Sequence, residues 1–321
     1  MCTRVLWNTD DRYLMAGRTM DWPESTQPTI VAFPRGRDRD GGRVGEFVAV
    51  AENPLRWASR FASLVTTVYG IGAVDGFNEA GLGMHALYLK STDVGARDAG
   101  RPGIQMGLFG QYLLDKAGTV AEALALVDEF QPVMVEAHGR QATLHFALED
   151  AAGDSAIIEF ACGEPVIHHG REYTIMTNDP TYDEQLGLLA QQDFSHPSRD
   201  MPLPGNVNAV DRFQRAAYYA ALLPESANTR QAVASIMAIM RNVSVPFGAP
   251  YAEFGVYNTE YRTVIDLNEK LYFFELSTSP NVIWIDFGAL KLGDQPLAIN
   301  PYDTSLIGDV TSRMQAQQVL F

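Results

Sequence analysis

The sequence predicts an α+β fold in the form of an αββα sandwich, with two stacked, mainly antiparallel sheets and helices on both outer faces. Short runs rich in Val, Ile, Thr and aromatic residues, bounded by Gly, Pro, Asn and Asp, recur along the chain and indicate strands. Two pairs of segments with helically spaced apolar residues interrupt these runs, which gives the order strands, helix pair, strands, helix pair, strands. Because an amphipathic helix must bury its apolar face, this order suits one helical layer on each side of two sheets.

The first predicted element is a hairpin near the N-terminus. Val5–Trp7 is a short apolar run, residues 8–11 (Asn-Thr-Asp-Asp) indicate a turn, and Tyr13–Ala16 indicates a returning strand. This hairpin brings Cys2 and Arg18 to the same end.

Later elements follow the same rules. The predicted strands are residues 30–33, 47–50, 63–69, 84–89, 143–148, 155–160, 262–267, 271–274 and 282–285, with a further strand that begins at Tyr173 and runs into a turn. The predicted helices are residues 104–117, a helix opened by a capping box at 119–122, a helix with Asn208 as its N-cap, and residues 229–241. Residues 75–82 are predicted as a turn and residues 188–204 as a loop.

Composition excludes several classes of partner. The chain has 321 residues, of which 46% are hydrophobic, and we expect one domain over residues 1–321. A formal net charge of −15, with no Lys/Arg cluster, argues against nucleic acid and against an anionic lipid surface. Without a run of about 18 apolar residues or a signal-peptide pattern, we expect no membrane association and a cytoplasmic location, or a periplasmic one if the sequence is that of a mature protein.

Neither a metal nor a cofactor is expected. Cys2 and Cys162 are the two cysteines, which excludes a disulfide framework, and Cys162 is predicted to be a buried strand thiol. His168 and His169 are adjacent and would point to opposite faces of a strand, with no Asp, Glu or Cys at ligand spacing. No Gly-Xaa-Gly-Xaa-Xaa-Gly opens a helix, so a phosphate-binding loop is not predicted.

Cys2 is a candidate nucleophile. If Met1 is removed, Cys2 carries a thiol of pKa about 8.5 and an α-amino group of pKa about 8 on one residue, so no separate base is required. A guanidinium from Arg18 would favour the thiolate, and the Asp21 carboxylate could hold the terminal ammonium. An ordinary surface arginine and a turn aspartate fit the same local pattern, so both interpretations stay open on these residues alone.

Five segments in order carry a resemblance. They are Cys2 with Arg18-Thr-Met-Asp21, Asp-Gly-Phe-Asn-Glu-Ala-Gly-Leu at 75–82, Met-Thr-Asn-Asp-Pro at 176–180, the segment 204–215 with Arg212-Phe-Gln-Arg215, and Tyr-Arg-Thr-Val-Ile-Asp at 261–266. Together they resemble the choloylglycine hydrolase and penicillin V acylase family of N-terminal-nucleophile (Ntn) amidohydrolases. Trp22 resembles the branch found in Gram-negative bacteria, whereas Tyr261 stands where the family more usually has Trp.

The resemblance implies an Ntn hydrolase that cleaves linear amides through a thioester acyl-enzyme on Cys2. It assigns oxyanion stabilisation to the Tyr88 backbone N–H and to the Asn178 side-chain amide, and an active-site role to Arg212. With Arg18, Arg212 would favour the thiolate and hold Asp21 in place. We expect the substrate pocket to be lined by Trp22, His85 and Tyr88.

The substrate is left open among three classes known for the family. Tyr88 and Trp22 favour small-molecule phenoxyacyl or fatty-acyl amides, as in a penicillin V acylase, over bile salts, and N-acyl homoserine lactones are the third class. A non-catalytic binding protein on the same fold is the alternative from another class, and the complete set of site residues argues against it. The resemblance also implies a homo-oligomer, a tetramer.

Overall fold

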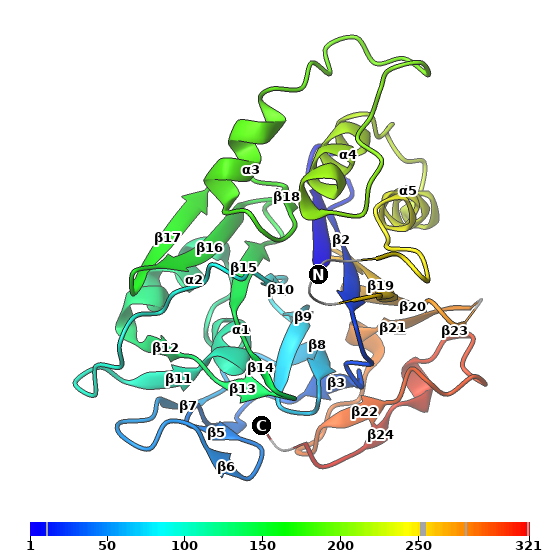
Figure 1. Ribbon diagram of the computed structural model, residues 1–321. Helices are drawn as coiled ribbons and strands as arrows, with labels where there is room; N and C mark the ends of the chain where they lie inside the picture. Colours follow the sequence, from blue (N-terminus) through cyan, green and yellow to red (C-terminus); the bar gives the residue numbers. More distant parts are fainter. Residues whose placement is uncertain (11, 251–254, 280, 320) are drawn as a thin grey trace.

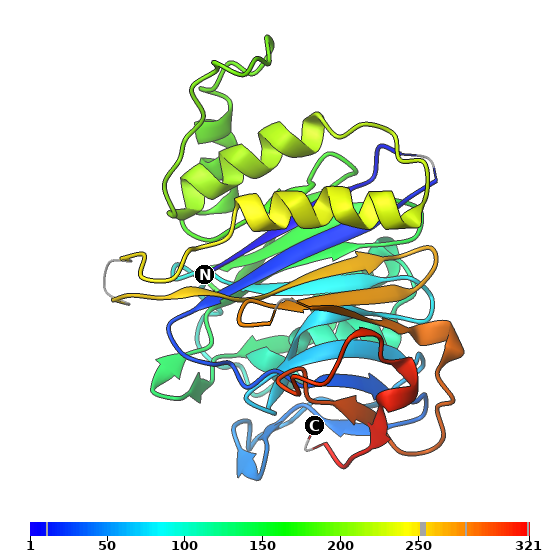
Figure 2. The ribbon, with the colours of Figure 1, turned by 90° about the vertical axis from the view of Figure 1, so that its right-hand side faces the viewer.

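The computed structural model describes residues 1–10, 12–250, 255–279, 281–319 and 321. Two sheets lie face to face, and helices cover their outer faces (Figures 1 and 2). The seven-stranded sheet has the order β18 (Ile175–Met176), β1 (Cys2–Trp7), β2 (Met15–Trp22), β19 (Asn258–Asp266), β20 (Leu271–Leu276), β21 (Val282–Asp286), β23 (Gly308–Asp309). The nine-stranded sheet has the order β17 (Glu164–His169), β16 (Ser155–Ala161), β15 (Leu144–Glu149), β10 (Gly83–Tyr88), β9 (Gly72–Asn78), β8 (Ser63–Val68), β3 (Ile30–Phe33), β22 (Leu297–Ile299), β24 (Gln315–Ala316).

The helices form the two outer layers. In the pair α4 (Ala209–Ala221) and α5 (Thr229–Asn242), α4 packs on β1 and α5 on β2 and β19 of the seven-stranded sheet, as Figure 2 shows. On the other side, α1 (Met106–Lys116) packs on β9 and β10, and α2 (Val120–Leu126) packs against α1. The predicted αββα sandwich is therefore confirmed.

Short elements complete the described chain. Four two-stranded sheets pair β11 (Gly103–Gln105) with β12 (Gln131–Val133), β13 (Glu136–Ala137) with β14 (Arg140–Gln141), β4 (Asp38–Asp40) with β7 (Arg56–Ala58), and β5 (Arg43–Val44) with β6 (Phe47–Val48). Three 3₁₀ turns cover Val127–Glu129, Phe287–Ala289 and Thr311–Arg313. None of the described helices has both the length and the apolar composition that a membrane crossing requires.

The predicted N-terminal hairpin is present, with a longer second strand. β1 and β2 pair antiparallel with Cys2 opposite Met20. Because β2 runs on to Trp22, Asp21 lies within a strand and not in a turn. Asp11, which belongs to the predicted turn, lies outside the described residues.

The structure differs from the sequence analysis in three further places. Residues 75–78 of the predicted turn belong to β9, so the turn itself is shorter. The helix α3 (Tyr182–Leu189) was not predicted, although its capping box between Thr181 and Glu184 is visible in the sequence. Cys162 is exposed with φ of +53°, in the turn between β16 and β17, so the prediction of a buried strand thiol is wrong.

Candidate active site

The alternation of side chains along β1 and β2 divides the site between two faces. On the inner face, Arg4 pairs with Glu149 of the opposite sheet at 2.6 Å, and Arg18 contacts the Cys2 thiol. On the outer face, under α4, the Thr3 hydroxyl accepts a hydrogen bond from Arg212 at 2.6 Å. The Cys2 thiol and Arg18 therefore lie on one face of the hairpin, and Arg212 contacts the hairpin from the opposite face.

The Cys2 thiol is buried beside a cation. Its residue is 3% exposed, and Sγ lies 3.5 Å from Nη2 of Arg18 and 3.7 Å from Sδ of Met20. Burial alone would lower the pKa of Arg18, but the neighbouring Cys2, Tyr261 and Asp75 raise it, so the guanidinium stays charged. Arg18 therefore places a fixed positive charge 3.5 Å from the sulfur.

Arg18 is held between two strands of the nine-stranded sheet. β9 and β10 pair only where Phe77–Asp75 lies opposite Gly83–His85. Beyond that point Arg18 donates to the carbonyl of Val74 on β9 and, at 3.0 Å, to the carbonyl of Ala86 on β10. The side chain takes over backbone hydrogen bonds that the two strands do not make with each other, which fixes its position at the thiol.

Asn178 belongs to the segment after β18, and its side chain lies beside the N-terminal end of β1. Its Oδ1 accepts hydrogen bonds from the Cys2 amide and from Nη2 of Arg212, both at 2.8 Å. Its Nδ2 donates to the Tyr88 carbonyl at 2.6 Å. Since arginine has no acceptor, Arg212 fixes the amide orientation and turns the Asn178 NH₂ group toward Tyr88.

Arg212 and Asp21 form the support behind Cys2. Fully buried Arg212 donates to the carbonyls of Cys2, at 2.6 Å, and of Val207, at 2.9 Å. Its Nη1 lies 3.6 Å from the Asp21 carboxylate. That carboxylate accepts hydrogen bonds from the hydroxyls of Thr259, at 2.5 Å, and Thr19, at 3.2 Å, and faces away from the thiol.

Met1 occupies the position next to the nucleophile. Its amino group donates to the Asp21 carbonyl, and its carbonyl accepts from the Asp21 amide at 2.7 Å. Burial lowers the pKa of the Met1 amino group below its ordinary value, against the opposing effect of Cys2 and Asp21. An amine at this end of β1 is therefore desolvated, which favours its neutral, proton-accepting form.

The Tyr88 backbone lies on the edge of β10 that meets Asn178. The Leu89 amide donates to the Thr143 carbonyl on the β15 side of the sheet. Backbone groups alternate along a strand, so the Tyr88 N–H and C=O lie on the other edge of β10, where Asn178 meets the carbonyl. The Tyr88 ring packs on Trp22 with 5.7 Å between the ring centroids.

The expectation that His85 lines the substrate pocket is wrong. The residue is fully buried between the sheets. Its Nε2 lies 2.7 Å from a Glu149 carboxylate oxygen, and its Nδ1 lies 2.5 Å from an Asp75 carboxylate oxygen. The contact with Asp75 is an ion pair without hydrogen-bond geometry. Burial alone would lower the pKa of His85, but Glu149 and Asp75 raise it, which favours the imidazolium form between the two carboxylates. Its odd position on β10, opposite in parity to Tyr88, directs it to the other face.

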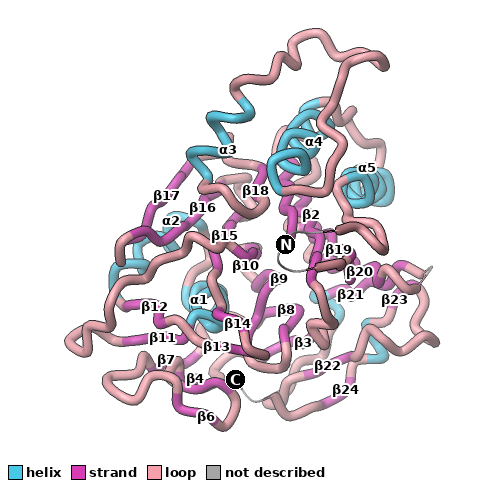
Figure 3. Tube along the Cα trace, in the orientation of Figure 1, coloured by secondary structure: helices cyan, strands magenta, loops and turns pink. Residues whose placement is uncertain are grey.

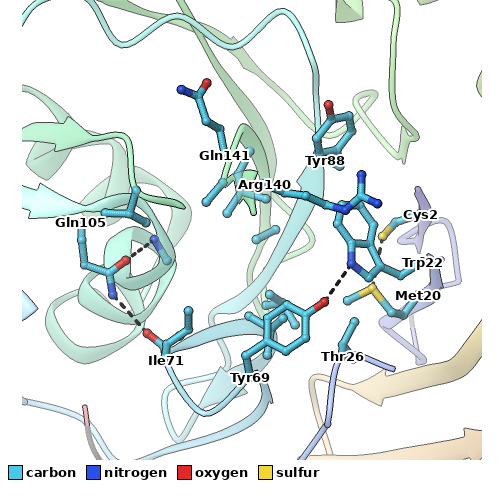
Figure 4. Close-up of a pocket in the computed structure, with 18 of the residues that line it drawn as sticks. Cys2, Met20, Trp22, Thr26, Tyr69, Ile71, Tyr88, Gln105, Arg140 and Gln141 are labelled. Carbon is cyan, nitrogen blue, oxygen red and sulfur yellow. Dashed lines mark hydrogen bonds between the residues drawn. The ribbon is translucent and has the colours of Figure 1, made fainter. Parts of the chain in front are cut away.

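An apolar pocket opens over the thiol (Figure 4). Trp22 and Tyr88 line it, and Trp22 Nε1 donates to the Tyr69 hydroxyl at 3.0 Å. The site residues that the sequence did not reveal include Met20, Tyr69, Gln105, Arg140 and Gln141. Parity along β2 could have found Met20, because it shares a face with Arg18 and Trp22, whereas the others come from distant segments, namely β11, β14 and the turn after β8.

The described part of the chain contains no evident metal-binding site. No group of three or more His, Cys, Asp or Glu side chains there is arranged to hold a metal ion. His168 lies 3.8 Å from Asp183, and His169 lies 2.8 Å from Asp154, each in a separate pair. The arrangement around Cys2 suits attack by a thiolate on an acyl carbon.

Comparison with known proteins gives one consistent family. The family model for linear amide C–N hydrolases, choloylglycine hydrolase family, matches residues 2–305. Penicillin V acylase of Pectobacterium atrosepticum is 34% identical over 313 residues, covering 89% of this chain and 80% of that protein. A bile salt hydrolase/transferase of Bifidobacterium longum is 24% identical over 283 residues, covering 77% of this chain and 83% of that protein.

Solved structures agree with these matches. The structure of penicillin V acylase from Agrobacterium tumefaciens has 36% sequence identity and a TM-score of 0.88, with 99% of this chain and 98% of that chain covered. A conjugated bile acid hydrolase from Clostridium perfringens has 20% identity and a TM-score of 0.79, with 96% of this chain and 98% of that chain covered, and it shares the fold.

Proposed function

The chain belongs to the choloylglycine hydrolase family of linear amide C–N hydrolases, and from that membership we propose that Cys2 is its nucleophile and a small-molecule N-acyl amide its substrate. The family confirms the predicted activity class, a hydrolase similar to penicillin V acylase. The observation that carries the assignment of Cys2 is the 3.5 Å contact between its Sγ and Arg18 Nη2 at an apolar pocket.

The proposed reaction begins after removal of Met1. The Cys2 α-amino group takes the thiol proton, and the thiolate attacks the amide carbon to form a tetrahedral intermediate. The protonated amine then gives its proton to the leaving nitrogen as the C–N bond breaks, which leaves a thioester on Cys2. Water attacks the thioester, its proton passes to the same amine, and the C–S bond breaks to release the carboxylic acid.

The developing oxyanion is proposed to lie between the Tyr88 N–H and the Asn178 side chain. An amide NH₂ group has two donors, and one of those on Asn178 is directed to the Tyr88 carbonyl, so the other can serve the oxyanion. Such a donor is typically worth about 3 kcal/mol of barrier. Arg212 acts as a positioning residue, because it holds the Cys2 backbone and Asn178 without contacting the thiol, and the Asp21 carboxylate acts through its ion pair with Arg212.

The acyl group is proposed to be a phenoxyacyl or fatty-acyl chain. Support comes from the apolar walls of the pocket and from the aromatic pair Trp22 and Tyr88 at its rim, which suit a flat or flexible group and crowd a rigid steroid. Penicillin V is one candidate, by analogy with the relatives named above. Bile salts and N-acyl homoserine lactones are the alternatives, and loss of catalysis on the same fold is disfavoured by the intact contacts of Cys2.

Two measurements test the proposal. Intact mass of an active preparation should correspond to the chain without Met1, and a full-length mass in active protein contradicts the mechanism. Cys2→Ser should be nearly inactive, because a hydroxyl is a much poorer nucleophile than a thiol at neutral pH. Cys162→Ser is the matched control, since that thiol is exposed in a turn and should be dispensable.

The acyl preference has its own test. The ratio of kcat/KM for phenoxyacetyl, medium-chain acyl and glycocholyl amides should favour the first two in the wild type. Tyr88→Asn should shift the ranking toward the steroid by removing the ring. An unchanged ranking would mean that Tyr88 does not select the acyl group.

A homo-oligomer, a tetramer by resemblance to the family, is the proposed state in solution. The segment 190–208 between α3 and α4 supports it, because it carries neither helix nor strand and projects from the body of the molecule (Figure 3). Light scattering coupled to size-exclusion chromatography decides between this state and a monomer.

A further inference from the structure

We propose that His85 is a positioning residue for the nucleophile, because it holds the Asp75 carboxylate and thereby keeps Arg18 directed at the Cys2 thiol. His85 is not among the described residues that line the pocket, so its effect on the reaction passes through two other side chains. This inference rests on the proposed function, because it names a further group on which the proposed attack by Cys2 depends.

The ion pair between His85 and Asp75 lies where β9 and β10 separate. These two residues are the last opposed pair in the described register of the two strands, and His85 Nδ1 lies 2.5 Å from the carboxylate. One residue further on, the carbonyls of Val74 on β9 and Ala86 on β10 both accept hydrogen bonds from Arg18. The ion pair therefore lies directly beside the gap that the guanidinium fills.

Other groups than Arg18 occupy both oxygens of the Asp75 carboxylate. Its Oδ1 lies at the His85 imidazole, and its Oδ2 accepts a hydrogen bond from the Tyr272 hydroxyl of β20 at 2.6 Å. The Tyr272 hydroxyl also lies 2.6 Å from the Thr66 hydroxyl of β8, which holds it in place. The described ion pair of Asp75 is thus with His85, and the guanidinium stays available to the thiol.

The charges of Asp75 and Arg18 nevertheless act on each other. Burial alone would raise the pKa of Asp75, but His85 lowers it most and Arg18 lowers it further. Burial alone would lower the pKa of Arg18, but Cys2 raises it most and Asp75 also raises it. In the space between the sheets, from which water is excluded, such attractions are stronger than in water. Asp75 and the Cys2 sulfur therefore compete for one guanidinium, and the charge of His85 offsets the attraction by Asp75.

Removal of His85 would leave Asp75, and not Glu149, without a cation. Glu149 also pairs with Arg4 at 2.6 Å and keeps that partner. A fully buried carboxylate that loses its partner must take up a proton or another cation. Arg18 can supply the cation, because its Nε is buried and has no hydrogen-bond partner among the described residues. Movement of the guanidinium toward Asp75 would take it away from the sulfur.

The experiment is a double-variant cycle in the mature enzyme, with rates referred to the folded fraction. His85→Asn should lower kcat for a phenoxyacetyl amide by about 10- to 100-fold and change KM by less than about threefold, as expected when a group at the reacting atoms is misplaced. Adding Asp75→Asn removes the competing charge and should restore most of the lost kcat, because the two residues are coupled. Asp75→Asn alone should cost less than His85→Asn. The double variant should have kcat near the wild-type value whether or not the single variant folds.

A second readout needs no substrate. With Cys162→Ser as the background, Cys2 is the single thiol, and its alkylation by iodoacetamide is followed by the mass of the protein. The alkylation rate should fall in His85→Asn and recover when Asp75→Asn is added.

The matched control is Arg39→Gln. This change also leaves a buried carboxylate without its cation, because Arg39 Nε lies 2.7 Å from Asp115 and both side chains are buried. The described contacts of Arg39 are with Asp115 and with the rings of Phe33 and Phe321, none of which lines the pocket. Arg39→Gln should therefore lower the free energy of unfolding and change neither kcat nor the alkylation rate.

Each result bears on one proposal or the other. Wild-type kcat in folded His85→Asn would mean that Asp75 takes up a proton and leaves Arg18 in place, which overturns the positioning role. A loss of kcat that Asp75→Asn does not relieve, or an equal loss in Arg39→Gln, also overturns it, because general destabilisation has these effects. If the mature wild type hydrolyses no amide of the earlier panel, the proposed function fails, and the alkylation rates still decide whether His85 acts on the sulfur.

Discussion

The side-chain oxygen of Asn178 accepts a hydrogen bond from the Cys2 amide at 2.8 Å, although 176 residues separate the two in the chain. If the Asn178 NH₂ group also stabilises the oxyanion, Asn178→Ala should lower kcat by about 10²- to 10³-fold, with a smaller effect on KM. Asn268→Ala is the control, because that side chain is exposed and distant from the thiol in the fold. Near-normal kcat in a folded Asn178→Ala enzyme would remove Asn178 from the mechanism.

The pH dependence of the rate should report the terminal amine. The Cys2 nitrogen, which becomes the α-amino group once Met1 is removed, lies at the start of the fully buried strand β1, and burial disfavours an ammonium. A base must be neutral to accept a proton, so kcat/KM should fall as the pH drops through the pKa of this amine. Because burial disfavours the ammonium form, the acidic limb should lie below the ordinary α-amino value of about 8. A limb centred at or above that value argues against the amine as the base.

His85 should control how stability depends on pH. Its raised pKa means that its contribution is complete below the ordinary histidine value and is lost as the pH rises through the folded-state pKa. Burial alone would raise the pKa values of Asp75 and Glu149, but His85 lowers both, so their contribution is present above the ordinary carboxyl values and is lost as the pH falls. The free energy of unfolding should therefore be greatest between these limits, in mildly acidic solution.

The same network predicts a large cost for removing the cation. His85→Asn leaves two buried carboxylates without their shared partner and should lower the free energy of unfolding by about 3–5 kcal/mol. It should also remove the decline of stability toward alkaline pH, which urea unfolding at several pH values measures. His196→Asn, on an exposed loop, serves as the control. An unchanged alkaline slope in His85→Asn would mean that another group causes it.

The contact between Gly72 and Gly107 should not tolerate a side chain. A Cβ on Gly72 would lie 2.5 Å from the Gly107 carbonyl oxygen, and that atom belongs to the backbone of α1 and cannot rotate away. Gly72→Ala should lower the free energy of unfolding by about 1–3 kcal/mol. Gly187→Ala in α3 has open space around its Cβ and should raise stability by about 0.5–1 kcal/mol. Equal effects of the two substitutions in thermal unfolding would show that this close approach is not rigid.

Features that depend on neighbours in the chain could be predicted from the sequence. The hairpin of β1 and β2 follows from two apolar runs around a turn, and it brings Arg18 to Cys2 without any knowledge of the rest of the fold. The two helix pairs follow from their periodicity. The family motifs then supply Asn178 and Arg212, which local patterns alone do not connect to Cys2.

Features that depend on which face a strand presents could not be predicted as well. His85 was assigned to the pocket because it precedes Tyr88, but a strand turns each successive side chain over, and its partners Asp75 and Glu149 come from two other strands. Cys162 was expected to continue an apolar strand, whereas the chain turns at that residue. Arg140 gave no signal at all, because the sequence of a short polar hairpin does not distinguish it from a surface turn, and only the structure shows that it lines the same pocket as Cys2.

The separateness of the hairpin formed by β13 and β14 has a practical consequence for altering this enzyme. The groups proposed to act on the scissile bond come from β1, β2, α4, the end of β10 and the segment after β18, while residues 136–141 belong to neither large sheet. Their backbone pairs within the hairpin, and none of the described hydrogen bonds of Cys2 includes them. This stretch can therefore be randomised or exchanged with that of a relative as one cassette, and a library confined to it should alter the substrate preference while the nucleophile keeps its geometry.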